Sequence, residues 1–240
     1  MRALTTAALV ALPLLLLSAG PAAAESPRSM MMELHLGSYT PEVDSEFSDA
    51  TPWKDIFGTE SLLMFKLHVD YQLWQGHGTL AIGGSTGYGW VDGVALNSEG
   101  QASNDKVGFN VAPFNLGFIY RWDWASRHSP LPLVPYFKVG LTAAVWWATN
   151  AKDEVANTRG ANGQSLVGRG VTLGWHAGVG LQFLLDILAP GMASEFDYES
   201  GVNNSYVFAE LLYQRLDDFG SDTSMVLSDT ALSFGLMFEF

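Results

Sequence analysis

The sequence predicts an all-β fold, an eight-stranded antiparallel transmembrane β-barrel with a short periplasmic helix between strands 6 and 7. The first observation is an alternation of apolar with mostly small or polar residues that continues to the last residue, Phe240. A period of two places alternate side chains on opposite faces of a strand. The second is that 48% of the residues are hydrophobic, yet beyond residue 24 no apolar run approaches the roughly 18–20 residues that a spanning helix needs. The third is that eight segments alternate in this way, and bacterial single-chain barrels have an even strand number.

The first 24 residues predict a secretory signal peptide that is cleaved from the mature chain. Arg2 precedes an apolar core, and Ala22 to Ala24 form a small-residue cleavage site before Glu25. We therefore divide the chain into a signal peptide at 1–24 and a barrel domain at 25–240. The sequence contains no cysteine, so neither disulfides nor thiol chemistry is expected.

The expected strands follow from the alternation, segment by segment. The clearest segment is 62–74, where Phe65, Leu67 and Val69 alternate with Lys66 and His68. A soluble strand with a dry core behind it would not place polar residues in register in this way. The eight segments are 30–39, 62–74, 79–90, 108–122, 133–147, 170–184, 204–215 and 226–240.

The connections between these segments predict the topology. With both termini in the periplasm, 40–61, 91–107, 148–169 and 216–225 are the outer connections, and 75–78 and 123–132 are short inner ones. The third inner connection, 186–203, is long, and Asp186 and Pro190 are signals for the start of a helix. This helix would lie in the membrane interface or cap the barrel mouth, and its net acidity favours the cap. A ten-stranded barrel that uses part of 148–169 remains open.

Ten titratable residues are expected to point into the barrel. Because the interior of eight strands is just wide enough for side chains to fill it, a salt-bridge network that plugs the lumen is the favoured interpretation. The alternative is a narrow polar path gated by Lys66, Lys138 and Glu210, since inward glycines such as Gly83 and Gly140 would leave free volume. The candidate lumen residues are Glu33, His35, Lys66, His68, Asp70, Arg121, Lys138, His176 and Glu210, joined by Glu239.

The sequence gives no catalytic constellation, so the protein is expected not to be an enzyme and to carry no cofactor. His68 and Asp70 share a strand face but lie roughly 7 Å apart along the strand, without a nucleophile beside them. The acidic segment from Glu42 to Asp49 lacks the glycine and the terminal glutamate of an EF-hand loop. No metal site is therefore predicted, and a solvated acidic surface, bridged by divalent cations to lipopolysaccharide, is favoured.

Charge and the C-terminal residues indicate the partners. The formal net charge of -13 argues against nucleic acid. The pattern of Gly235, Phe238 and Phe240 resembles the C-terminal signal by which outer-membrane barrels are recognised for assembly. The expected partners are outer-membrane lipid, lipopolysaccharide and, transiently, the barrel assembly machinery, and a monomer is favoured with the oligomeric state left open.

The whole mature chain resembles the small eight-stranded outer-membrane barrels of the OmpA, OmpX and OmpW kind. More narrowly, it resembles a family of outer-membrane β-barrel proteins from myxobacteria and their relatives, to which no reaction is assigned. The resemblance rests on the segments 32–47, 185–204, 206–210 and 230–240. It implies an integral protein of the Gram-negative outer membrane.

The expected role is structural or surface-binding, through the acidic outer loops. A narrow channel for small solutes and a lipid-modifying enzyme are the alternatives, and a secreted β-sandwich is the alternative fold.

Overall fold

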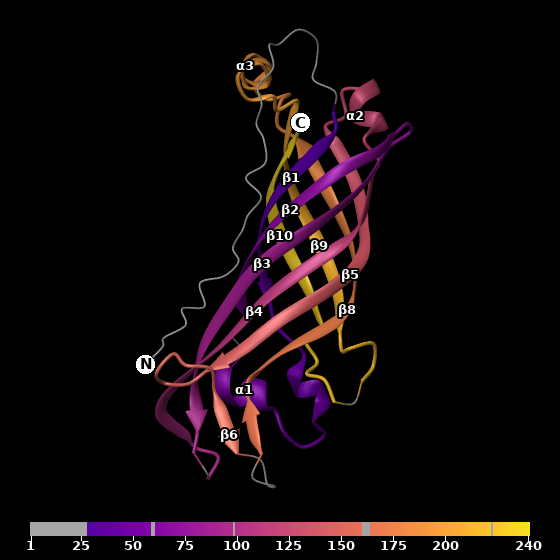
Figure 1. The fold of residues 1–240 in the computed structure, drawn as a ribbon. Coiled ribbons are helices and arrows are strands. Elements are labelled where there is room, and N and C mark those ends of the chain that lie inside the picture. The colour runs from indigo at the N-terminus through magenta and orange to yellow at the C-terminus, as the bar shows by residue number, and fades with distance from the viewer. Residues whose placement is uncertain (1–27, 59–60, 98, 160–163, 222) are drawn as a thin grey trace, which may run out of the picture.

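The computed structural model describes residues 28–240 apart from 59–60, 98, 160–163 and 222, and it forms a closed antiparallel β-barrel (Figure 1). The fold class and the count of eight barrel strands are confirmed. The signal peptide lies outside the described residues and stays a prediction. The barrel strands are β1 (Met30–Tyr39), β2 (Leu62–Gln75), β3 (Thr79–Leu96), β4 (Ala102–Arg121), β5 (Leu133–Thr149), β8 (Arg169–Leu184), β9 (Asn204–Leu216) and β10 (Asp229–Glu239).

Closure occurs between the first and last strands. Met32 on β1 is the register partner of Phe238 on β10 and of Val69 on β2, so β1 is hydrogen-bonded on both sides. The barrel has no free sheet edge, which is the condition for β-structure to cross hydrocarbon. The C-terminal pattern takes part directly, because the Phe240 backbone N–H donates to the Met30 carbonyl at 2.8 Å.

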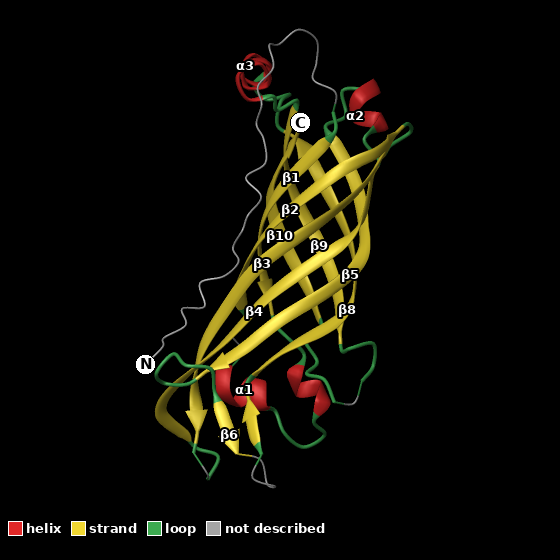
Figure 2. Cartoon of the chain, in the orientation of Figure 1, coloured by secondary structure: helices red, strands yellow, loops and turns green. Residues whose placement is uncertain are grey.

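The two ends of the barrel differ, and Figure 2 shows the described helices gathered at these ends. We call the end near the described N-terminal residues and the C-terminus the terminus end, and the opposite end the loop end. The terminus end carries α2 (Trp124–His128) and α3 (Pro190–Ser200), and the loop end carries η1 (Val43–Glu46) and α1 (Pro52–Phe57). None of the described helices is long and apolar enough to cross a membrane.

The strand bounds differ most from prediction at the loop end. β3 and β4 continue as a hairpin past Trp90 and Gly108, with Val94 paired to Lys106 and Leu96 to Ala102. The sequence did not reveal this extension because, outside a membrane, neither face of a hairpin has to be uniformly apolar. In the next connection, β6 (Asn157–Arg159) and β7 (Ser165–Val167) form a separate two-stranded sheet. Because these two strands do not join the barrel, the barrel has eight strands and not ten.

The predicted helix between strands 6 and 7 of the barrel is α3, but the expectation that it caps the barrel mouth is wrong. Its Phe196 ring packs edge-on against Phe238, at 6.3 Å between centroids, and Phe238 belongs to the outward-facing set of β10. Met192 and Tyr198 are 72% and 75% exposed. The apolar residues of the helix thus follow the outer surface near the terminus end rather than the polar lumen.

The connection before α3 also contains the one carboxyl outside the barrel wall whose pKa is clearly shifted among the described residues. Burial raises the pKa of Asp186 above its ordinary value, and the hydrogen bond from the Ser205 backbone N–H to its Oδ1, at 3.2 Å, opposes this shift. Asp186 therefore costs stability once it is ionised.

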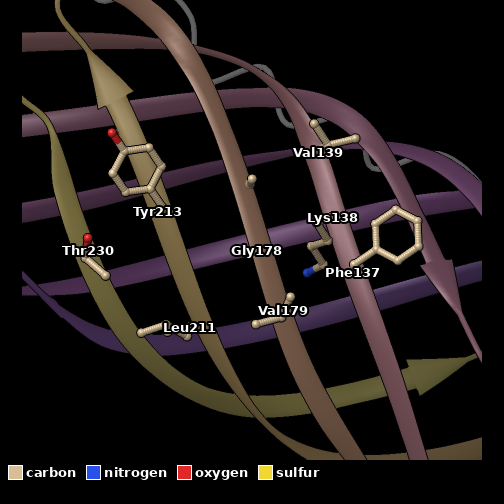
Figure 3. Close-up of a pocket in the computed structure, with 9 residues that line it drawn as sticks. Phe137, Lys138, Val139, Gly178, Val179, Leu211, Tyr213 and Thr230 are labelled. Atoms are coloured by element: carbon tan, nitrogen blue, oxygen red, sulfur yellow. The ribbon is translucent and has the colours of Figure 1, made fainter.

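The outer face is a band of exposed apolar side chains bordered by aromatic rings, as outer-membrane barrels require. Tyr88 stacks on Trp90 and Trp147 towards the loop end, with centroids 5.6 and 6.1 Å apart, and Tyr120 lies 5.7 Å from Phe137 towards the terminus end. Figure 3 shows a hollow in this band, lined by side chains of β5, β8 and β9 and by Thr230 of β10.

Candidate functional site

The inward faces of the strands bring most of the sequence-predicted polar residues into one buried network. Its centre is the Lys138 ammonium, which lies 2.5 Å from Glu33 Oε2 and 2.9 Å from Glu210 Oε2. The three side chains are at most 4% exposed. Tyr136 donates a further hydrogen bond to Glu210 at 3.0 Å. One lysine thus holds two carboxylates from across the lumen, since Lys138 is on β5, four strands away from Glu33 on β1, and Glu210 is on β9 between them.

Two histidines lie against this centre. His35 Nε2 is 2.9 Å from Glu33 Oε2, and His68 Nδ1 is 3.8 Å from the same oxygen. The other nitrogen of His68 is 3.0 Å from Asp70 Oδ1. Strand geometry suggested that His68 and Asp70 were too far apart to interact, but their side chains bend together. Glu33, His35 and His68 have a possible metal-ligand atom each within 4.8 Å of one another.

A second buried ion pair closes the terminus end of the lumen. Arg121 Nη1 lies 3.1 Å from Glu239 Oε1, and its Nε donates to Gln182 at 2.8 Å. Glu239 also accepts hydrogen bonds from Gln72 and Asn204, at 2.8 and 2.9 Å. The Arg121 side chain is 0% exposed, so neighbouring side chains enclose this ion pair completely.

The remaining candidates lie on the loop-end side of the centre. His176 shares a hydrogen bond with Thr142 at 2.9 Å, and Thr142 donates to Asn115 at 2.6 Å, which in turn donates to Ser85 at 2.7 Å. His176 is therefore not part of the Glu33 cluster. Lys66 points inward beside it and makes no ion pair within 4.0 Å with any described residue.

An apolar plug, which the sequence analysis missed, closes the loop end. Helix α1 inserts Trp53, which is 6% exposed, and its ring lies 5.2 Å from Phe109 and 4.6 Å from Phe57. The spacing of Trp53, Ile56 and Phe57 is a helical signal that could have revealed it. The plug consists of Tyr39, Val43, Trp53, Leu62, Met64, Val91, Phe109, Val111, Ala144, Leu216 and Leu227, with Phe57, Trp146 and Met225 packed against it.

The expectation that inward glycines leave free volume is wrong. A Cβ built on Gly140 would lie 2.8 Å from His176 Cε1, and one on Gly180 would overlap the Tyr136 ring. A Cβ on Gly83 would likewise overlap Asp70. Large side chains of neighbouring strands occupy the space beside these glycines. The glycines thus allow close packing of the lumen instead of leaving it empty.

The acidic loop residues are partly used as hydrogen-bond acceptors for the backbone. Asp44 accepts the N–H groups of Trp53 and Lys54 at 2.6 and 3.2 Å, and so holds the first turn of α1. Glu46 accepts the Val226 N–H at 2.5 Å, and Asp218 accepts the Leu173 N–H at 2.6 Å. These carboxylates fix the loops onto one another.

The assembly-signal residues occupy three different environments. Phe240 contacts β1 through its backbone, and Phe238 faces outward against α3. Gly235 points inward, where a Cβ would meet the Phe208 ring and the Leu34 carbonyl oxygen. The contacts of Gly235 and Phe238 depend on the residue type, whereas the contact of Phe240 is made by its backbone. Recognition by assembly machinery stays a prediction.

A family comparison identifies the class of protein. The model of the outer membrane protein beta-barrel domain family matches residues 9–240, so the chain belongs to this family and is a protein of the outer membrane. No curated protein matches the sequence.

The chain is also similar to several solved structures, at low sequence identity. Neisserial surface protein A is 11% identical and covers 88% of this chain and 96% of its own, with a TM-score of 0.45. OprG from Pseudomonas aeruginosa is 10% identical and covers 89% and 96%, with a TM-score of 0.48. Ail of Yersinia pestis is 13% identical and covers 88% and 97%, with a TM-score of 0.40.

Proposed function

We propose that this outer-membrane barrel is a sealed, non-enzymatic anchor that presents its loop end to the outside of the cell as a binding surface. The observation that carries the proposal is the closed lumen. The Arg121 pair, the Lys138 centre and the Trp53 plug fill it at three successive levels. A filled lumen favours a role at the surface over conduction, the alternative function.

The loop end has the construction of a positioned surface. The β3–β4 hairpin extends from the wall, and α1 is held in the mouth by Trp53 and Asp44. Loops held in this way lose less conformational entropy when a partner binds than free loops would.

Phe219 is a candidate contact residue on this surface. Its side chain is 62% exposed, and its backbone has a positive φ of 59°, next to Asp218 with a φ of 50°. A non-glycine residue in the left-handed region costs about 1–2 kcal/mol. The loop holds this conformation through the hydrogen bond from Leu173 to Asp218. Strain of this kind is often retained where a side chain has to be presented in one direction.

The chemistry of the surface favours a cationic partner with apolar groups. Phe47 and Phe219 are exposed at the loop end, and so are carboxylates such as Glu42, Asp49 and Asp105. Attraction between exposed charges is screened by salt over about 10 Å at 0.1 M, so binding should weaken as ionic strength rises.

A binding assay with an amphipathic cationic peptide tests the proposal. The barrel is placed in lipid nanodiscs, which leave both ends accessible, and peptide binding is followed by fluorescence at several salt concentrations. We expect salt-sensitive binding that weakens at least fivefold in Phe219→Ala, because a buried aromatic contact is commonly worth about 1 kcal/mol or more. The matched control is Tyr198→Ala on α3, an exposed aromatic at the terminus end, which should leave binding unchanged. Absence of binding, or equal losses in both variants, would contradict the proposal.

A further inference from the structure

We propose that Glu33, His35 and His68 form a site for one divalent transition-metal ion inside the barrel. The three residues are brought together by strand register. Glu33 and His68 are direct partners across β1 and β2, and His35 is the next inward residue after Glu33 on β1. One carboxylate and two imidazoles are a common ligand set for zinc and related ions.

The distances between ligand atoms suit such an ion. A tetrahedral zinc with ligand bonds of about 2.0–2.2 Å separates its ligand atoms by roughly 3.3 Å. The two histidine nitrogens lie 2.9 and 3.8 Å from Glu33 Oε2, on either side of that value. Lys138 is on Oε2 of Glu33, whereas Oε1 is buried and has no hydrogen-bond partner among the described residues. Because both histidine distances are to Oε2, an ion between these atoms shares Oε2 with Lys138, and Oε1 is a second oxygen to which the ion or the ammonium can turn.

Both histidines are also oriented as metal ligands usually are. The nitrogen of His68 that points away from Glu33 lies 3.0 Å from Asp70. The corresponding nitrogen of His35 lies 3.4 Å from Ser233 Oγ and 3.9 Å from Glu210. A carboxylate or hydroxyl on the outer nitrogen fixes the ring and leaves the inner lone pair facing the metal.

The charges of the cluster call for a cation. Glu33, Asp70 and Glu210 bring three carboxylates, each at most 3% exposed. Among the described residues, Lys138 is the one lysine or arginine within 4.0 Å of them. Asp70 Oδ2 is buried and lacks a hydrogen-bond partner among the described residues, whereas Oδ1 faces His68 at 3.0 Å. Buried ions persist only when they are paired or coordinate a metal, and a doubly charged ion balances the two remaining negative charges.

The enclosure of the site sets the design of the experiment. Because the Arg121 pair and the Trp53 plug close both ends, the ion would bind as the barrel folds. The mature protein is therefore refolded at a series of buffered free Zn²⁺ concentrations, folding is verified by heat-modifiable gel mobility, and retained zinc is measured by mass spectrometry after desalting. We expect one zinc ion for each folded chain.

Variants separate ligands from neighbours. At the zinc concentration that fills the wild type, His35→Gln and His68→Gln should each retain less than a tenth as much. Asp70→Asn should raise the half-saturating zinc concentration about 10–100-fold, as expected for a group that orients a ligand. The matched control is His176→Gln, which removes a buried histidine of the same lumen outside the cluster and should retain a full equivalent.

Two results would overturn the proposal. One is a folded wild-type barrel without zinc at any concentration, which would mean that protons on the histidines balance the carboxylates. The other is equal zinc loss in His176→Gln and His68→Gln. If the histidine variants fail to fold, Co²⁺ in the wild type replaces them as the test. Visible absorption typical of tetrahedral nitrogen and oxygen ligation that shifts in Asp70→Asn supports the site, and an unshifted or absent spectrum contradicts it.

Discussion

Removal of the Arg121 charge should destabilise the barrel more than any exposed ion pair could. In Arg121→Met, Glu239 stays buried with Gln72 and Asn204 as donors but without a countercharge. Breaking one side of a buried ion pair costs about 3–5 kcal/mol. Because the two amide donors remain, we expect about 3 kcal/mol, which is roughly a hundredfold change in the folding equilibrium.

A double-mutant cycle isolates the ion pair from the loss of packing. Arg121→Met with Glu239→Gln should recover at least about 1 kcal/mol relative to Arg121→Met alone, since no unpaired charge remains. The assay is urea unfolding in detergent or lipid vesicles, followed by tryptophan fluorescence. The control, Arg215→Met, breaks the exposed Arg215–Asp217 pair and should show no measurable change. An equal effect of Arg121→Met and Arg215→Met would refute the reasoning.

Three further changes probe the plug, the packed interior and the α3 connection. Trp53→Ala removes the central ring of the loop-end plug, and comparable core deletions cost about 3–5 kcal/mol. Helix α1 should therefore leave the mouth, and tryptic cleavage after the exposed Lys54 should accelerate at least tenfold while the barrel stays folded. Gly180→Ala forces a Cβ into the Tyr136 ring, so urea unfolding should show a loss of about 1–3 kcal/mol, and an unchanged stability would mean that the lumen does have free volume. Asp186 has a raised pKa in the folded state, so its protonated form stabilises the fold at low pH and this contribution is lost as pH rises through the folded pKa. Asp186→Asn should therefore raise stability at neutral pH and flatten its pH dependence just above the ordinary aspartate pKa, as followed by urea unfolding at several pH values.

The wall of the barrel was predictable because lipid and lumen impose opposite demands on alternate residues. Leu34 and Leu36 are 45% exposed on the outer face, whereas Glu33 and His35 between them are at most 7% exposed. The same contrast places Lys138 and Glu210 inside. This alternation is a local property of consecutive residues, so a single sequence is enough to find it.

The contacts inside the barrel depend on register and on loops, which alternation does not specify. Contact between Glu33 and Lys138 requires two strands distant in the sequence to place these residues at the same position along the barrel axis. The place of Trp53 depends on α1 folding back into the mouth, and the place of α3 depends on Phe238 offering an outer apolar surface. Gly140 and Gly180 looked like free space because a sequence does not show which neighbouring side chain fills it.

The central claim is that the lumen is closed, and single-channel conductance of the refolded mature protein in a planar bilayer tests it most directly. Heat-modifiable gel mobility verifies folding in the same sample. We predict no conductance steps from the folded wild type, because buried side chains fill three successive levels of the barrel. Reproducible conductance steps that change in Lys66→Ala or Lys138→Ala would contradict the account and make the lumen a path.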